Sequence, residues 1–262
     1  RKASFSLQVR DIVIPYDVFG MFVLPGEVND VEIIFENELQ SYYLRSEAGV
    51  LEKTDENAWS WRAPEKKGVY KVTAFNQSQT DSITINFFVM IPYDKLTGSS
   101  LNGYRIGAYP LSNNPRYPLP EGFIELTAEN YDTPVSPNFT LGEFVCKQQS
   151  NYPKYIVLKE KLILKLELII DELEDEGIHI ENMVVMSGYR TPYYNKAIGN
   201  VQYSRHVFGD AADVFIDNNN DFRMDDLNND GVSNKKDARI IYQIIDGMKD
   251  QTWYKNFIGG LG

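Results

Sequence analysis

Short runs of alternating apolar and polar residues fill the first third of the chain. Runs such as Val31–Phe35 and Ile83–Val89 are separated by Gly, Pro, Asn and Asp. Alternation with a period of two is typical of strands with one buried face. We therefore predict antiparallel β-structure over residues 1–92, as an immunoglobulin-like sandwich. Trp59 and Trp61 are two residues apart, so we expect both rings on one face of a strand, in the core.

The remaining two thirds of the chain follow a different pattern. Residues 93–153 are rich in Pro, Gly, Asn and Tyr, which predicts a long connection that leads into a second domain. Two helices and two strands are expected in residues 154–262, an α+β mixture. Their expected ranges, from helical or continuous apolar patterns, are a helix at 155–176 that ends at Gly177, strands at 178–186 and 212–216, and a helix at 236–248. The fold class is thus two-domain, all-β followed by α+β.

Composition narrows the class of partner. The 262 residues carry a formal charge of −11, and Lys and Arg form no cluster, which argues against nucleic acid as a partner. No stretch of 18 or more apolar residues predicts a membrane span. Cys146 is the only cysteine, so an intrachain disulfide is excluded. We expect a monomer without a membrane span.

The densest set of candidate metal ligands lies at residues 204–213. This segment reads Ser-Arg-His-Val-Phe-Gly-Asp-Ala-Ala-Asp, and the turn Ser187-Gly-Tyr-Arg190 precedes it. The two motifs resemble the zinc D-Ala-D-Ala carboxypeptidase and hedgehog-type family, over roughly residues 100–262. The resemblance implies that His206 and Asp213 are zinc ligands, that Arg190 meets the substrate near the reacting carbonyl, and that Ser204 forms a hydrogen bond near the metal or to the substrate.

The chemistry of zinc agrees with these residue types. Zinc accepts imidazole nitrogen and carboxylate oxygen, and a catalytic site offers three protein ligands and one open position for water. Gly209 allows a tight turn between the two ligands and Ala211 keeps the space behind the metal small. An arginine at position 190 suits a carboxylate or an oxyanion because its guanidinium is planar and always charged.

The third zinc ligand and the general base are not assigned. The resemblance places a histidine and an acidic residue on a strand that follows a Gly-Gly-x-Gly turn, and here Gly259–Gly262 end the sequence. The other histidine, His179, starts a predicted strand whose far end carries Arg190, and eleven extended residues span about 36 Å. Two explanations stay open. We favour the explanation that the natural protein continues past Gly262, because the residues of both motifs are present. The other explanation is that the site is degenerate.

A second metal-binding motif occupies residues 226–237. The spacing of its oxygen-bearing residues matches the twelve-residue calcium loop, with Gly231 at the sixth position. The predicted ligands are Asp226, Asn228, Asp230, the carbonyl of Val232, Asn234 and Asp237. The loop resembles those of dockerin modules, which also end in Asp and lead into a helix. Because one loop is present, we expect a structural calcium site and no docking to a cohesin.

Two functions from different classes follow. The first is a zinc-dependent carboxypeptidase or endopeptidase that acts on D-amino acid bonds of peptidoglycan stem peptides, outside the cytoplasm, with the sandwich as a spacer or wall-binding module. The second is a non-catalytic module that keeps the peptidase fold and binds wall fragments or a protein. A downstream strand with an aromatic-His-x-Asp pattern would favour the enzyme.

Overall fold

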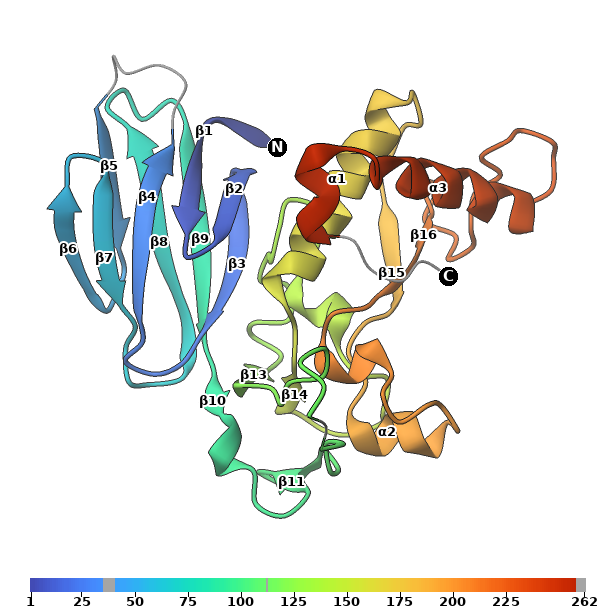
Figure 1. Cartoon of the computed structure of the whole chain (residues 1–262), viewed down its shortest axis with the longest axis horizontal. Coiled ribbons are helices and arrows are strands. Elements are labelled where there is room, and N and C mark those ends of the chain that lie inside the picture. Colours follow the sequence, from blue (N-terminus) through green and yellow to red (C-terminus); the bar gives the residue numbers. More distant parts are fainter. Residues whose placement is uncertain (35–40, 112, 258–262) are drawn as a thin grey trace.

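The computed structural model describes residues 1–34, 41–111 and 113–257. Most of the regular structure is β, in several sheets, and few helices accompany it (Figure 1). The strands within residues 2–89 are β1 (Lys2–Val9), β2 (Ile12–Tyr16), β3 (Val18–Val23), β4 (Val28–Ile34), β5 (Tyr42–Ser46), β6 (Val50–Asp55), β7 (Ala58–Arg62), β8 (Gly68–Asn76) and β9 (Ser82–Val89).

These strands form two sheets that pack face to face (Figure 1). One has the order β2-β1-β4-β7-β6 and the other β3-β9-β8-β5. In β4 buried and exposed residues alternate strictly, as the period of two predicts. Trp59 and Trp61 are both buried, and Trp61 stacks on Phe87 of the opposite sheet with ring centroids 4.1 Å apart. The predicted core role of both tryptophans is therefore correct.

One strand departs from the predicted antiparallel pattern. β3 pairs with β9 in parallel, from Val18 opposite Thr84 to Val23 opposite Val89. The chain leaves the first sheet at Asp17 and enters the second at its edge, so β3 runs in the direction of β9. The packing of two sheets is observed, whereas the immunoglobulin-like description and the division into two domains stay predictions.

Residues 93–153 contain little regular structure. β10 (Ile91–Pro92), β13 (Gly122–Leu126) and β14 (Lys154–Ile156) form a small sheet, and β11 (Ser100–Leu101) pairs with β12 (Tyr104–Arg105). Aromatic rings hold this connection against its neighbours. Tyr93 stacks on Phe123 at 5.8 Å, and Tyr109 meets Phe208 edge-on at 6.2 Å.

The C-terminal elements are α1 (Glu160–Asp175), β15 (Met183–Ser187), α2 (Pro192–Ala197), β16 (Asp213–Ile216) and α3 (Lys235–Met248). The predicted start of the first helix, at 155, is wrong because residues 154–156 pair with β13. The predicted strand at 178–186 starts only at 183. Its first residues are held differently: the Ile178 amide donates to the helix-end carbonyl of Leu173, and the Glu181 amide donates to Asn218 Oδ1.

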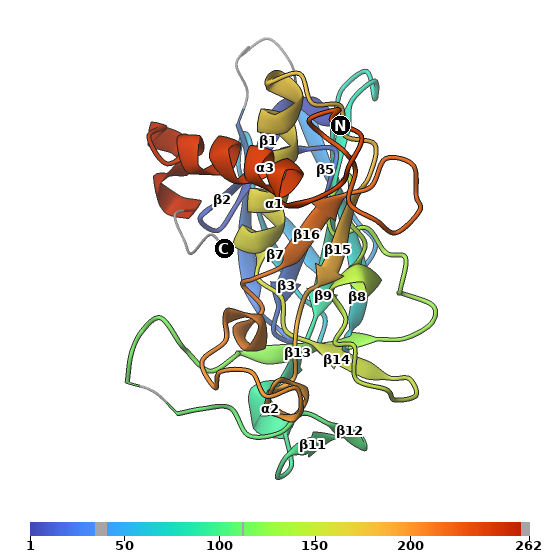
Figure 2. The ribbon, with the colours of Figure 1, turned by 90° about the vertical axis from the view of Figure 1, so that its right-hand side faces the viewer.

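The first sheet lies beside α1 (Figures 1 and 2), and polar contacts join the two. Tyr16 Oη donates to Asp171 Oδ2 at 2.7 Å, and the Lys2 amine lies 3.0 Å from the same oxygen. Arg10, in the β1–β2 turn, pairs with Glu160 at 2.5 Å in the first turn of α1. The N-terminal sheet thus lies directly beside the helix that borders the candidate site. Among the described residues no helix is long and apolar enough to cross a membrane.

Candidate metal centre

The antiparallel pair β15–β16 delivers the first part of the site. Ser187, at the end of β15, lies opposite Asp213, at the start of β16, after an irregularity in the register. The Ser187–Arg190 turn follows β15 directly. Residues separated by more than twenty positions in the sequence are thereby brought to one end of the strand pair.

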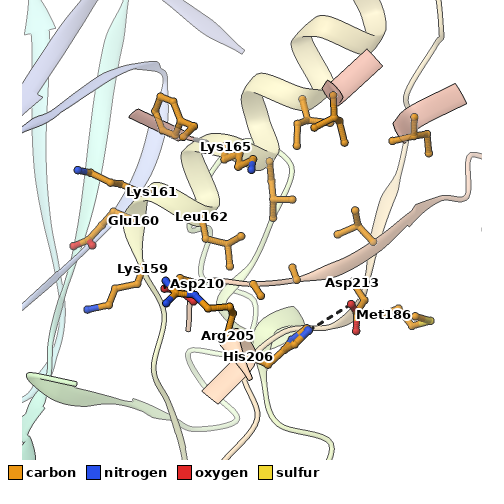
Figure 3. A pocket seen from close by; sticks show the side chains of 18 of the residues that line it. Lys159, Glu160, Lys161, Leu162, Lys165, Met186, Arg205, His206, Asp210 and Asp213 are labelled. Carbon is orange, nitrogen blue, oxygen red and sulfur yellow. Dashed lines mark hydrogen bonds and ion pairs between the residues drawn. The ribbon is translucent and has the colours of Figure 1, made fainter. Parts of the chain in front are cut away.

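His206 lies on a 3-10 turn, Arg205–Phe208, that approaches Asp213 (Figure 3). Its Nδ1 donates to the Gly188 carbonyl at 2.8 Å, which leaves the lone pair on Nε2. Nε2 is 3.4 Å from Asp213 Oδ1. The imidazole is 11% exposed and the Asp213 carboxylate 40%. A metal-binding histidine usually donates its other ring N–H to a carboxylate, a backbone carbonyl or water, as His206 donates to Gly188.

Gly209 ends this turn in the left-handed conformation, with φ of +71°. A Cβ at this position would lie 2.3 Å from the Val157 carbonyl oxygen, so only glycine fits the close approach. The carbonyl of Gly209 in turn accepts a hydrogen bond from the Lys159 amide at the start of α1. The turn that carries His206 is therefore anchored to the helix.

Arg190 reaches Asp213 from the preceding turn. Its Nε donates to Ser187 Oγ at 3.0 Å, and its Nη2 donates to Asp213 Oδ2 at 2.8 Å. The Arg190 amide also donates to the His206 carbonyl at 3.1 Å. The structure thus brings three of the predicted zinc-site residues, His206, Asp213 and Arg190, to one place. Ser204, the fourth, is buried at the N-terminal end of the 3-10 turn.

Residues 137–235 match the family model Peptidase M15. The matched segment contains the turn at Arg190, His206 and Asp213, and it supports a peptidase. It is shorter than the stretch of roughly 100–262 over which the sequence motifs suggested a resemblance. No curated protein matches the chain.

The segment that matches this family model borders a cleft of about 980 Å³. Its walls come from α1, β16, α3, the 3-10 turn and the β1–β2 turn of the N-terminal sheet. His206, Asp213 and Ala211 line it, and Met186 lies beside Asp213 at one end (Figure 3). The candidate metal ligands His206 and Asp213 therefore line a space that is large enough for a peptide.

Two residues of the cleft were not singled out from the sequence. Asp210 and Arg205 form an ion pair across the His206 turn, and Arg205 also donates to the carbonyl of Arg116. Burial raises the pKa of the Asp210 carboxyl, although Arg205 and Lys159 favour its charged form. Arg205 and Asp210 lie next to named residues of the 204–213 motif, and this position was the sequence feature that could have pointed to them. Their pairing could not be predicted, because it depends on the folded turn.

The tyrosine of the Ser187–Arg190 turn, Tyr189, has a structural role. Tyr189 is fully buried, and its hydroxyl is 2.7 Å from that of Tyr109. Burial raises the pKa of Tyr189 well above its usual range. Its amide donates to the Phe144 carbonyl, which fixes the turn that carries Arg190. Tyr189 therefore supports the turn that carries Arg190 from within the core, and it does not line the cleft.

His179, the second histidine of the chain, has no hydrogen bond or ion pair with His206, Asp213 or Arg190 among the described residues. Its side chain is 75% exposed and its Nε2 lies 3.2 Å from Glu181 Oε1. Within the described residues, His, Cys, Asp and Glu form no group of three or more that could hold a metal ion. His206 and Asp213 therefore offer two ligands to a metal. The turn at 259–262, after which the third ligand was expected, lies outside the described residues.

In the predicted calcium loop, backbone amides of the loop donate hydrogen bonds to its carboxylates. Asp226 Oδ1 and Oδ2 accept hydrogen bonds from the amides of Asp230 and Gly231. Asp237 accepts the amides of Asn228 and Asn234, and these bonds lower the pKa of its carboxyl, with the Asn234 amide as the largest cause.

Two further predicted ligands of the loop bind each other. The Asn234 side-chain amide donates to the Val232 carbonyl at 2.7 Å, while the Asn234 side-chain oxygen caps α3 at Lys236. Asp230 Oδ2 pairs with the Lys236 amine at 2.8 Å. The calcium assignment and the dockerin-like description therefore stay predictions.

Proposed function

We propose that the chain is a zinc-dependent peptidase that cleaves D-amino acid bonds in peptidoglycan stem peptides. One observation carries the proposal: His206 Nε2 and Asp213 Oδ1 lie 3.4 Å apart, at one end of a peptide-sized cleft, within the segment that matches Peptidase M15. Imidazole and carboxylate are zinc ligands, and the hydrogen bond from Nδ1 to Gly188 orients the ring for binding through Nε2.

His206 and Asp213 would hold the metal. When bound, zinc polarises the scissile carbonyl and lowers the pKa of its water toward neutrality. Asp213 uses Oδ1 toward His206 and Oδ2 toward Arg190, so Arg190 fixes the orientation of the carboxylate. The carboxylate then has one oxygen for the metal.

Arg190 also has a group left for the substrate. Nε and Nη2 are bonded to Ser187 and Asp213, whereas Nη1 has no hydrogen bond to the described residues. The side chain as a whole is 14% exposed, and Arg190 adjoins the cleft through Asp213, which lines it. A fixed cation in such a place stabilises an oxyanion or binds a peptide carboxylate. Ser204, buried at the start of the 3-10 turn, supports the turn that carries His206.

The substrate class implies a location outside the cytoplasm, where peptidoglycan is exposed. The N-terminal sheets would then serve as a spacer or a wall-binding module. Calcium in the loop at 226–237 would order the segment between β16 and α3. These three points extend the proposal and rest on the sequence motifs.

A non-catalytic wall-binding module is the second candidate. It is favoured by the absence, among the described residues, of a third metal-binding side chain beside His206 and Asp213. The ion pair of Arg190 with Asp213 would then be a structural element of the turn. Such a module would bind stem peptides and release no product from them.

The test is zinc content together with D-alanine release from a stem pentapeptide, measured on the full-length protein. Wild type should hold one zinc and release D-alanine, and His206→Ala should lose both. His179→Ala is the matched control, because it removes the exposed second histidine, and it should keep both. Stoichiometric zinc without turnover on any stem peptide would favour the binding module, and a protein without zinc would overturn the proposal.

A further inference from the structure

One wall of the cleft has an unusual composition. Leu162, Leu166 and Ile169 of α1 line it at helical spacing, as an apolar stripe requires. Lys165 lies within that stripe, and Lys159 lies one turn before Leu162, at the start of the helix. Both lysines line the cleft and are half-buried. Figure 3 shows them on either side of Leu162.

The acidic residues of the cleft are already neutralised. Each has a cationic partner within ion-pair distance: Asp11 with Lys161 at 2.8 Å, Glu160 with Arg10 at 2.5 Å, Asp213 with Arg190 at 2.8 Å, and Asp210 with Arg205. Two of these pairs join α1 to the β1–β2 turn. The β1–β2 turn of the N-terminal sheet therefore supplies the counter-charges for Glu160 and Lys161.

Lys159 and Lys165 have no such partner. In the part of the chain that the structure describes, neither amine has a carboxylate oxygen within ion-pair distance. The Lys165 amine lies over the Tyr254 ring, 5.3 Å from its centroid, which holds it by a cation–π contact without neutralising it. Two amines without a carboxylate in ion-pair distance give this wall a local positive charge that attracts an anion, although the whole chain carries −11 and Lys159 also favours the charged form of Asp210.

We propose that Lys159 and Lys165 form a carboxylate-binding subsite on the α1 wall, which selects peptides that carry a free acidic group. This inference rests on the proposed function, because it takes the cleft beside His206 and Asp213 as the substrate site. A stem tripeptide of the type L-Ala-γ-D-Glu-L-Lys offers two carboxylates, that of the glutamate and that of the C-terminus. An ammonium binds either as a point charge.

The experiment measures calorimetric binding of this tripeptide to the full-length zinc protein in three forms: with both carboxylates free, with the glutamate carboxylate amidated, and with the C-terminal carboxylate amidated. The tripeptide lacks D-alanine, so binding is read without its release. Variants are Lys159→Gln and Lys165→Gln, with Lys165→Arg as the charge-retaining form. Lys161→Gln is the matched control, because Lys161 lines the same cleft but is paired with Asp11.

Wild type should bind the free tripeptide about tenfold more tightly than one of the two amidated forms, and that form identifies the carboxylate. Lys165→Gln and Lys159→Gln should each remove much of this difference, while Lys165→Arg and Lys161→Gln should retain it. Equal affinity for all three forms, or the same loss in Lys161→Gln, would overturn the subsite. In that case continued D-alanine release from the pentapeptide would leave the proposed function standing, and its absence would remove both.

Discussion

Two segments of the chain contain motifs that predict metal binding, and their candidate ligands are positioned in different ways. In residues 204–213, the side chains of His206 and Asp213 meet across a 3-10 turn and a strand end. In residues 226–237, Asp226 and Asp237 accept hydrogen bonds from amides of the same loop. The candidate ligands of the first segment come from two elements and line a cleft. Candidate ligands of the second segment form hydrogen bonds within their own loop.

The difference lies in what fixes each ligand. His206 is held by the Gly188 carbonyl and Asp213 by Arg190, so groups outside the motif position both. Groups inside the loop position the Asp237 carboxylate. Positioning from outside leaves a free lone pair that faces the cleft. Positioning from inside gives the loop carboxylates hydrogen bonds from their own backbone.

The largest expected effect comes from removing the charge of a predicted zinc ligand. Asp213→Asn should lower D-alanine release by about 10³-fold and abolish stoichiometric zinc, because the metal loses an anionic ligand. Asp226→Asn makes the same change in the other segment and should leave both values near wild type. Zinc analysis and initial rates measure the two variants. Equal losses in both would remove the distinction between the segments.

Gly209→Ala tests whether the His206 turn depends on its glycine. The new Cβ would clash with the Val157 carbonyl at a φ of +71°, so the free energy of unfolding should fall by about 3 kcal/mol or more. Gly199→Ala has a similar φ of +74° but no atom within 4 Å of its Cβ, and it should cost about 1 kcal/mol. Denaturant titration compares them. Similar losses in the two would mean that the close approach does not exist.

Calcium should stabilise the loop at 226–237 if the predicted ligands bind it. Saturating calcium should raise the free energy of unfolding by about 1 to 3 kcal/mol, because the ion binds the folded loop better than the unfolded chain. Asp226→Ala should lose that response and keep His206 chemistry. Melting curves in calcium and in chelator provide the measurement. Identical curves would show that the loop is an acidic turn.

The smallest effect concerns the pH dependence of Asp237 in chelator. Its folded pKa lies below the ordinary value of 3.8, mainly because the Asn234 amide donates to the carboxylate. The stability it contributes is therefore fully present above 3.8 and is lost as the pH falls through the folded pKa. Asp237→Asn should melt below wild type at pH 7, and the gap should narrow below pH 4. A constant gap across this range would contradict the role of the charge.

Much of the fold was accessible from the sequence. The alternation in residues 1–92 predicted the strands, and the apolar spacing predicted α1 and α3. An element that buries one face carries apolar residues at the period of that element, so its type can be predicted from the sequence. The parallel pairing of β3 and the late start of α1 at Glu160 were not predicted. Both depend on partners far away in the chain, β9 and β13, which no local pattern reveals.

The site was accessible in part. His206, Asp213 and Arg190 were named because the two motifs resemble those of a known zinc peptidase family. The carbonyl of Gly188, the Arg205–Asp210 pair and the cleft wall from the β1–β2 turn were missed. Backbone acceptors carry no residue signature, and contacts between distant segments arise only on folding.

The most direct test of the account is anomalous diffraction at the zinc edge from crystals of the full-length protein. We expect one peak within bonding distance of His206 Nε2 and Asp213 Oδ1, about 2.0 to 2.2 Å from each. No zinc peak should lie in the loop at 226–237. A peak in that loop with none beside His206, in crystals saturated with zinc, would contradict the central claim that the 204–213 segment is the metal centre.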